Sequence, residues 1–333
     1  MTETTSAKAI AALPPLKVGY ADGEIEGLLD QGHVLALIGF GSRAGASVDP
    51  RYLCVGLEPT QAGRFEVWQS ASAVVSGRTE SLRWSSDGDY LFFAVEIDEA
   101  QAGDLDAAGE SAYRAICQLI ASHRFSDGKP GHILRLWNYL DAINEGAGDE
   151  ERYRHFCAGR ARGLTLSVRN GYSAATAIGR RDGRRILQVY GLAAREAGVA
   201  VENPRQLSAW SYPRQYGPVA PTFARATRTA ADQLLVSGTA AVLGHQSQHA
   251  GDTFAQLDET LRNLDSLLTA AGPDIALRGI GATLLKVYLR DRAEATAVES
   301  HLRERLPGLG DMIILVSDIC RSDLRIEIDG ILG

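Results

Sequence analysis

The sequence has little of several features that would indicate a membrane or a nucleic acid as partner. No run of eighteen apolar residues occurs among its 333 residues, so we predict no membrane span. Asp and Glu number 41 against 34 Lys and Arg, and the net charge of −7 argues against nucleic acid binding. Residues 1–15 lack the basic and then apolar pattern of a signal peptide, and we expect a disordered lead into a cytoplasmic protein.

Cysteines are few and scattered as well. None of the four stands in CxxC spacing, which argues against a structural zinc and against a disulfide framework; they are Cys54, Cys117, Cys157 and Cys320. His245 and His249 are four residues apart, as metal ligands can be, but no third ligand follows nearby. We therefore predict no metal.

The last strand-like segment of the chain, residues 323–330, has a faint earlier copy at 184–191. Aligning the final glycines of the two segments places Gln188 opposite Glu327. A carboxylate can give and take protons, whereas an amide cannot. This asymmetry indicates one working site, near the C-terminus.

Each of these segments closes a similar order of elements, so we interpret the chain as a duplication. Strands that alternate with helices packed on one side predict an α+β fold with mixed sheets. We expect an N-terminal domain at 16–197 and a catalytic domain at 198–333. The elements of the first copy are expected at 90–97, 104–124, 133–140, 150–162, 174–178 and 185–190, and those of the second at 233–241, 252–271, 282–290, 293–305, 312–316 and 324–328.

Two local signals refine this expectation. The turn at 181–183 is expected to join the last two strands of the first copy as a hairpin. Asp252 is expected to cap the long helix of the second copy, whose apolar residues recur on one stripe.

Glu327 lies in an alternating strand. Leu324, Ile326 and Ile328 share one face, which we expect to pack against the helices, whereas Arg325, Glu327 and Asp329 share the other. Glu327 then points toward a partner sheet or a cleft. Asp329 would raise its pKa and Arg325 would lower it. The alternative is a solvated strand carboxylate without a function.

The second half resembles the RidA/YjgF family of small trimeric imine deaminases. The resemblance is carried by 235–239, 254–268, 285–290 and 325–328 and spans about a third of the chain. The family's substrate-binding arginine would fall near Met312, where no arginine stands. This departure argues against deaminase chemistry.

Over nearly its full length the chain resembles a chorismatase, a family whose members carry RidA-like halves in one polypeptide. The motifs that carry this resemblance are 136–140, 143–144, 152–160, 212–218, 237–240 and 320–327. It implies cleavage of the enolpyruvyl ether of chorismate to pyruvate and a hydroxybenzoate, without a metal or an organic cofactor. It also implies that Glu327 is the acid/base residue, and that Cys320, as in the hydroxybenzoate-forming members, steers the ring chemistry. Members that only hydrolyse chorismate differ from the hydroxybenzoate-forming members around the position of Ala240. The alanine found here does not decide between the two reactions.

Chorismate carries two carboxylates, so an acidic protein needs basic groups concentrated at its site. Our candidates are Arg160 and Arg290, although each arginine taken alone is more typical of the surface. Tyr212 and Tyr216, in the proline-rich segment 211–221, and Arg225 support them; the same segment could be a plain linker. Arg160 would reach across from the first half, which predicts a site between the halves.

Three alternatives remain open at this stage. The product could be 3-hydroxybenzoate, which we favour, with or without 4-hydroxybenzoate, or the dihydrodiol of simple hydrolysis. The chain could instead be an imine deaminase or a non-catalytic binding protein on the same scaffold. Its assembly could be a homotrimer or a monomer with pseudo-threefold symmetry.

Overall fold

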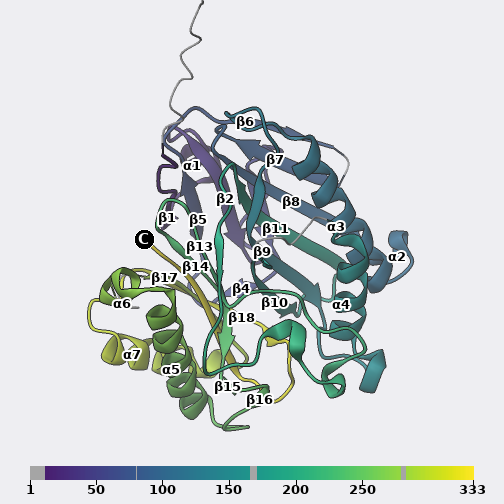
Figure 1. The fold of residues 1–333 in the computed structure, drawn as a ribbon, viewed down its shortest axis with the longest axis vertical. Coiled ribbons are helices and arrows are strands. Elements are labelled where there is room, and N and C mark those ends of the chain that lie inside the picture. The colour runs from purple at the N-terminus through teal and green to yellow at the C-terminus, as the bar shows by residue number, and fades with distance from the viewer. Residues whose placement is uncertain (1–11, 80, 166–170, 279–282) are drawn as a thin grey trace, which may run out of the picture.

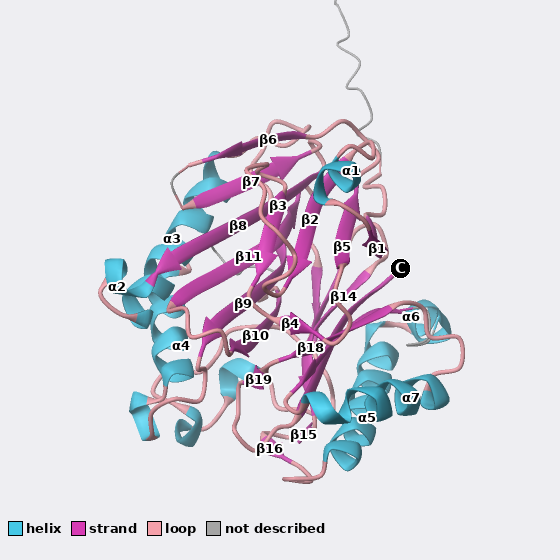
Figure 2. Ribbon diagram, turned by 180° about the vertical axis from the view of Figure 1, so that it is seen from behind, coloured by secondary structure: helices cyan, strands magenta, loops and turns pink. Residues whose placement is uncertain are grey.

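The computed structural model describes residues 12–79, 81–165, 171–278 and 283–333, and these form an α+β fold of three large sheets (Figures 1 and 2). The expected disordered lead falls largely on residues 1–11, outside the described part. Within that lead, however, Leu13 is buried and the Pro14 carbonyl accepts a hydrogen bond from the Tyr90 hydroxyl. No helix in the described part is long and apolar enough to cross a membrane.

The first sheet is built from the N-terminal segment. Its strand order is β1 (Lys17–Asp22), β5 (Arg64–Gln69), β2 (Val34–Phe40) and β3 (Tyr52–Val55). The five-residue helix α1 (Ile25–Leu29) covers its outer face, where Ile25, Leu28 and Leu29 pack in a small apolar cluster.

The second sheet has seven strands, and its helices lie on one face (Figure 1). The strand order is β19 (Asp318–Ile319), β10 (Ala174–Arg180), β9 (His132–Asp141), β11 (Ile186–Ala194), β8 (Tyr90–Asp98), β7 (Leu82–Ser86) and β6 (Val75–Arg78). The helices are α2 (Glu99–Ala102), α3 (Leu105–Ser122) and α4 (Arg152–Gly163).

The third sheet also has seven strands and its own helical layer. The strand order is β12 (Val199–Val201), β13 (Ala226–Arg228), β14 (Leu234–Ala240), β20 (Ile326–Leu332), β17 (Thr283–Leu289), β18 (Met312–Val316) and β4 (Glu58–Pro59). The helices are α5 (Thr253–Ala271), α6 (Pro273–Arg278) and α7 (Ala295–Arg305), and the short pair β15 (Val242–Leu243) and β16 (Gln246–Ser247) lies beside them. Asp252 caps α5 as expected, because its carboxylate accepts the Phe254 and Ala255 N–H groups.

The duplication is visible in the strand pairing. The order β8-β11-β9-β10 in the second sheet matches β14-β20-β17-β18 in the third, with two antiparallel pairs followed by a parallel one. Gln188 lies opposite Tyr139 and Glu327 lies opposite Tyr288, so the two positions are equivalent. The first sheet repeats the same order and senses, so the span 16–197 holds two such units.

The expected hairpin around residues 181–183 is wrong. β10 and β11 are consecutive in sequence, but β9 lies between them, parallel to β10 and antiparallel to β11. A parallel partner needs a helical crossover, and α4 provides it before β10. The turn at 181–183 therefore does connect β10 to β11, but these two strands do not pair with each other.

The three sheets turn their inner faces toward one another around a common core. Large aromatic side chains from all three sheets fill it, among them Trp68, Trp137, Tyr190 and Tyr288. Two strands exchange partners between the halves, because β19 joins the second sheet and β4 joins the third. The halves are thus packed as one unit with clefts where two sheets meet.

Candidate active site

A cavity of about 380 Å³ lies where the second and third sheets meet. Its walls come from α4, β10, β14 and β20 and from the loops around residues 206–225 and 320–324. The residues that the argument uses are Arg154, Arg160, Thr176, Tyr212, Tyr216, Phe223, Arg225, Gly238, Ala240, Cys320, Arg321 and Glu327. The volume suits a small organic ligand.

Glu327 lies in the wall of this cavity and is only 4% exposed. Burial, reinforced by the neighbouring Asp329 carboxylate, raises its pKa to about 8. Arg135, Arg225 and Arg321 oppose this rise. A carboxyl with such a pKa is mostly protonated at neutral pH and can act as an acid.

A bulge in β14 makes the room for this carboxyl. The pairing of β14 with β20 shifts register between Val236 and Thr239, so β14 carries one extra, unpaired residue beside the Glu327 side chain. Gly238 stands at this bulge, and a Cβ there would lie 1.9 Å from Glu327 Oε1. The absence of a side chain at residue 238 is therefore a condition for the observed position of Glu327.

Two buried arginines, Arg160 and Arg225, line the cavity. Arg160 donates from Nη2 to the Thr222 carbonyl at 2.8 Å, and its Nε has no hydrogen-bond partner among the described residues. Arg225 donates from Nη2 to the Leu207 carbonyl and the Tyr212 hydroxyl, and its Nε is likewise unpartnered within the described part. Both guanidinium groups bring positive charge to the cavity wall, which favours an anionic ligand.

Aromatic side chains line the cavity beside these arginines. The rings of Tyr212 and Tyr216 lie 5.4 Å apart, and the Arg321 guanidinium stands 4.1 Å from the centre of the Tyr216 ring. The Tyr216 hydroxyl also contacts His245 Nδ1 at 3.2 Å. These contacts hold the proline-rich segment over the cavity, so it is part of the site rather than a free linker.

Cys320 and Ala240 flank Glu327. Burial, with the nearby Glu327 carboxyl, raises the pKa of the Cys320 thiol, so this side chain stays a neutral thiol at physiological pH. Ala240 is the direct strand partner of Glu327. Its small side chain leaves space in front of the carboxyl.

The expectation for Arg290 is wrong. This residue does not line the cavity; its guanidinium pairs with Asp318 and donates to the carbonyls of Leu324 and Arg321. It lies at the end of β17 and directs its donors to the loop that carries Cys320. Arg290 thus braces the wall of the site instead of facing a ligand.

The expectation that Arg325 shares a strand face with Glu327 is also wrong. β20 begins at Ile326, and Arg325 turns to Thr253 and Glu294 beside the helices, away from Glu327. Ile326 and Ile328 pack in the helical cluster, as expected, whereas Leu324 lies in the core between the sheets and lines the cavity. Of the two charged residues expected to act on the pKa of Glu327 from its own strand, it is Asp329 that does so.

Sequence reasoning missed Arg321, Arg154, Phe223 and the glycine at 238 as cavity residues. Arg321 could have been suspected from its place next to Cys320. Arg154 lies within the motif at 152–160, in α4, and donates to the Gln215 carbonyl of the proline-rich segment 211–221. In the described part of the chain no group of three or more His, Cys, Asp and Glu side chains is placed to hold a metal.

Comparison with known proteins identifies the family. The model of the N-terminal part of FkbO/Hyg5-like chorismatases matches residues 66–193. A 3-hydroxybenzoate synthase of Streptomyces hygroscopicus is 37% identical over 291 residues, which cover 82% of each chain. The chain belongs to the chorismatase family. A chorismatase of Streptomyces rapamycinicus is 36% identical over 285 residues, 80% of this chain and 82% of its relative.

A solved chorismatase structure has the same fold. It superposes with a TM-score of 0.82 at 30% identity and covers 98% of this chorismatase and 100% of its own chain. The cavity with Glu327 therefore lies within a fold shared over the whole length.

Proposed function

We propose that this chorismatase cleaves the enolpyruvyl ether of chorismate to pyruvate and 3-hydroxybenzoate, with Glu327 as the proton donor. The observation that carries the proposal is a buried carboxyl, with a pKa near 8, in a cavity lined by several arginines. An acid that is protonated at rest beside an anion-binding wall suits the opening of an enol ether in a dicarboxylate.

The reaction begins with the transfer of a proton to the terminal methylene carbon of the enolpyruvyl group. An ordinary Glu is protonated roughly one time in 500 at pH 7, a penalty of roughly 3.7 kcal/mol. A pKa of about 8 removes most of this penalty. The proton leaves Glu327, a C–H bond forms, and the positive charge that develops at the ether carbon is stabilised by the resulting carboxylate.

Arg160 and Arg225 are the proposed ligands of the substrate carboxylates. Each places a buried guanidinium in the cavity wall, and charge-assisted hydrogen bonds between a guanidinium and a carboxylate are strong. Tyr212, Tyr216 and Phe223 supply flat apolar surface for the ring. Cys320 stands beside Glu327 as a neutral thiol, which supports a role in guiding the ring intermediate toward the aromatic product.

Hydroxybenzoate and pyruvate together contain the same atoms as chorismate, so this outcome consumes no co-reactant. A hydroxyl of the substrate traps the cation in place of water. One ring oxygen then leaves with pyruvate and one ring carbon loses its proton, so the ring becomes aromatic and keeps a single hydroxyl. Trapping by water would instead give pyruvate and a dihydrodiol. Incubation with chorismate, a coupled dehydrogenase assay for pyruvate and chromatography of the ring product test the proposal; a preparation that releases no pyruvate contradicts it.

The rate is expected to fall as the pH rises through about 8, because the reaction needs the protonated form of Glu327. Asp329 raises this pKa, whereas Arg135, Arg225 and Arg321 lower it. A bound dianion adds negative charge, so kcat should decline at a higher pH than kcat/KM. The full pH profiles of both constants check this, and a decline that begins near pH 4 to 5 would contradict it.

A further inference from the structure

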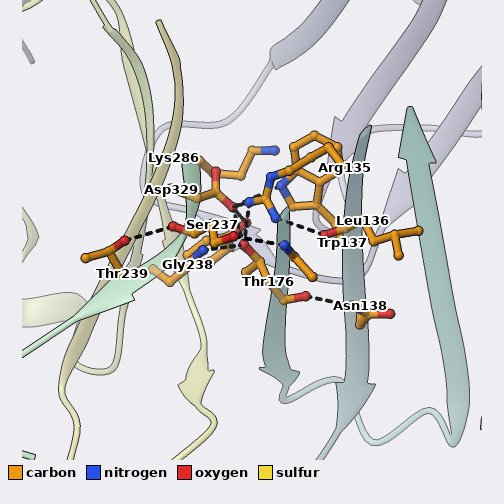
Figure 3. A network of polar contacts seen from close by, with 12 residues as sticks. Arg135, Leu136, Trp137, Asn138, Thr176, Ser237, Gly238, Thr239, Lys286 and Asp329 are labelled. Carbon is orange, nitrogen blue, oxygen red and sulfur yellow. Dashed lines mark hydrogen bonds and ion pairs between the residues drawn. The ribbon is translucent and has the colours of Figure 1, made fainter. Parts of the chain in front are cut away.

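One hydroxyl group in the wall of the candidate active site, that of Thr176, connects the second and third sheets (Figure 3). Thr176 of β10 is 2% exposed, and its Oγ1 donates to Asp329 Oδ2 at 2.9 Å. The same oxygen accepts from Arg135 Nη2 at 2.5 Å and from the backbone N–H of Gly238 at 2.9 Å. Its three partners come from β9, β14 and β20.

The first two partners form a fixed ion pair. Arg135 is fully buried, and its Nη2 lies 3.1 Å from Asp329 Oδ2. That carboxylate oxygen also accepts from Trp137 Nε1 and the Tyr288 hydroxyl, both at 2.9 Å. A buried pair with so many bonds has little freedom to move. It gives the Thr176 hydroxyl a rigid anchor.

The third partner is the bulge that houses the Glu327 carboxyl. Gly238 has no partner on β20 at this step, and its N–H bonds to Thr176 instead. The position of the 238 backbone sets the space around Glu327 Oε1, because this oxygen occupies the volume that a Cβ atom of residue 238 would need. Whatever fixes Gly238 thus fixes the wall against which the carboxyl rests.

We propose that Thr176 is a positioning residue for Glu327, because its hydroxyl ties the bulged backbone at Gly238 to the Arg135–Asp329 ion pair. Asp329 follows Glu327 by two residues on the same face of β20, so the network holds both the carboxyl's own strand and the wall opposite. This inference rests on the proposed function only in taking Glu327 as the proton donor.

The test compares three variants. Thr176→Val replaces the hydroxyl by a methyl group of similar size, and Thr176→Ser keeps the hydroxyl. Thr227→Val is the matched control. Like Thr176, Thr227 is buried and its hydroxyl accepts a hydrogen bond from the backbone of another strand, here the Ala174 N–H of β10 at 2.9 Å. Unlike Thr176, it does not line the cavity. A role limited to joining the sheets would affect both valine variants alike.

We expect Thr176→Val to lower kcat by about 10- to 100-fold with KM changed less than about threefold, because the carboxyl is misplaced while the arginine wall is intact. Thr176→Ser should recover kcat to within about threefold of the parent, and Thr227→Val should leave kcat nearly unchanged. Equal losses in the two valine variants, or a folded serine variant as slow as Thr176→Val, would overturn the proposal.

A second readout does not depend on turnover of chorismate. Carboxyl ¹³C NMR, with Glu327→Gln to assign the signal, follows the titration of Glu327 in each protein. We expect the midpoint to fall by about one pH unit in Thr176→Val, because a released bulge admits water, and to stay at the parent value in Thr227→Val. If the parent releases no pyruvate the proposed function fails, yet these midpoints still decide the inference: an unchanged midpoint in Thr176→Val contradicts it.

Discussion

Glu327→Gln is expected to abolish most pyruvate release from chorismate, with a loss of about 10²- to 10⁴-fold in kcat. The amide has nearly the shape of the protonated carboxyl, so the cavity and its arginines should be unchanged. What is lost is the transferable proton. Pyruvate release measured at pH 7 in the parent and the variant checks the result, and a variant that keeps near-full rate rules out this role.

The same substitution should make the protein more stable above pH 4.5. In the unfolded chain Glu327 ionises near its ordinary pKa of 4.5, whereas the folded protein keeps the proton up to about pH 8. The native state therefore binds more protons in this window, and its stability falls as the pH rises. Glutamine cannot ionise, so the variant avoids a cost on the order of a few kcal/mol at pH 8.

Thermal unfolding at pH 5 and pH 8 separates this effect from a general one. The parent should lose melting temperature between the two values, and Glu327→Gln should lose less. Glu99→Gln is a suitable control, because Glu99 is also buried but pairs with Arg152 at 2.8 Å and does not line the cavity. That variant should be less stable than the parent and as active, since it leaves a guanidinium without its partner.

The sequence was sufficient for the features that depend on periodicity. Alternation along one strand separated Ile326 and Ile328 from Glu327, and the match of two final glycines related Gln188 to Glu327 in the register that the strand pairing has. These are local properties of a strand. They hold whatever the sheets do afterwards.

Features that depend on how sheets meet could not be predicted in this way. The unit at 17–69 has only a five-residue helix and no second one within its described residues, so it lacks the helical periodicity that revealed the other two units. Arg290 and Arg321 are both basic residues near the last strands, but only the closure of the second sheet on the third decides which one faces the cavity. The Thr176 hydroxyl likewise meets Asp329 and Gly238 only because the second sheet packs against the third.

The cleft equivalent to the active site in the second sheet is closed by side chains. Gln188 Nε2 donates to Glu96 Oε1 at 2.8 Å and to the Cys54 carbonyl at 2.9 Å. Where the third sheet has the small Ala240 opposite Glu327, the second has Glu96 opposite Gln188. The amide thus serves to join two sheets, which explains why a carboxyl and an open space occur together in only one of these two equivalent places.

Gly238→Ala is expected to inactivate the protein without unfolding it. The added Cβ would lie 1.9 Å from Glu327 Oε1 and 2.8 Å from its Cδ, so one of the two groups must move. The Glu327 carboxyl is the far end of a flexible side chain and gives way more easily than the backbone. A displacement of about 1 Å at a reacting group costs on the order of 100-fold in rate, and we expect kcat to fall by at least about that factor.

Gly19→Ala is the matched control for this substitution. Gly19 lies in β1, and an added Cβ there meets nothing within 4 Å, so the variant should keep the parent's kcat. Gly19→Ala should unfold within a few degrees of the parent, since a glycine replaced at a compatible site changes stability by only about 1 kcal/mol. Gly238→Ala should lose more melting temperature than that but still unfold cooperatively, because the clash is with the end of a side chain and not with backbone. In a Glu327→Gln background Gly238→Ala should cost little further activity, because its target is already absent. A Gly238→Ala protein with the parent's rate would show that proton transfer does not require the carboxyl in the place where this bulge holds it.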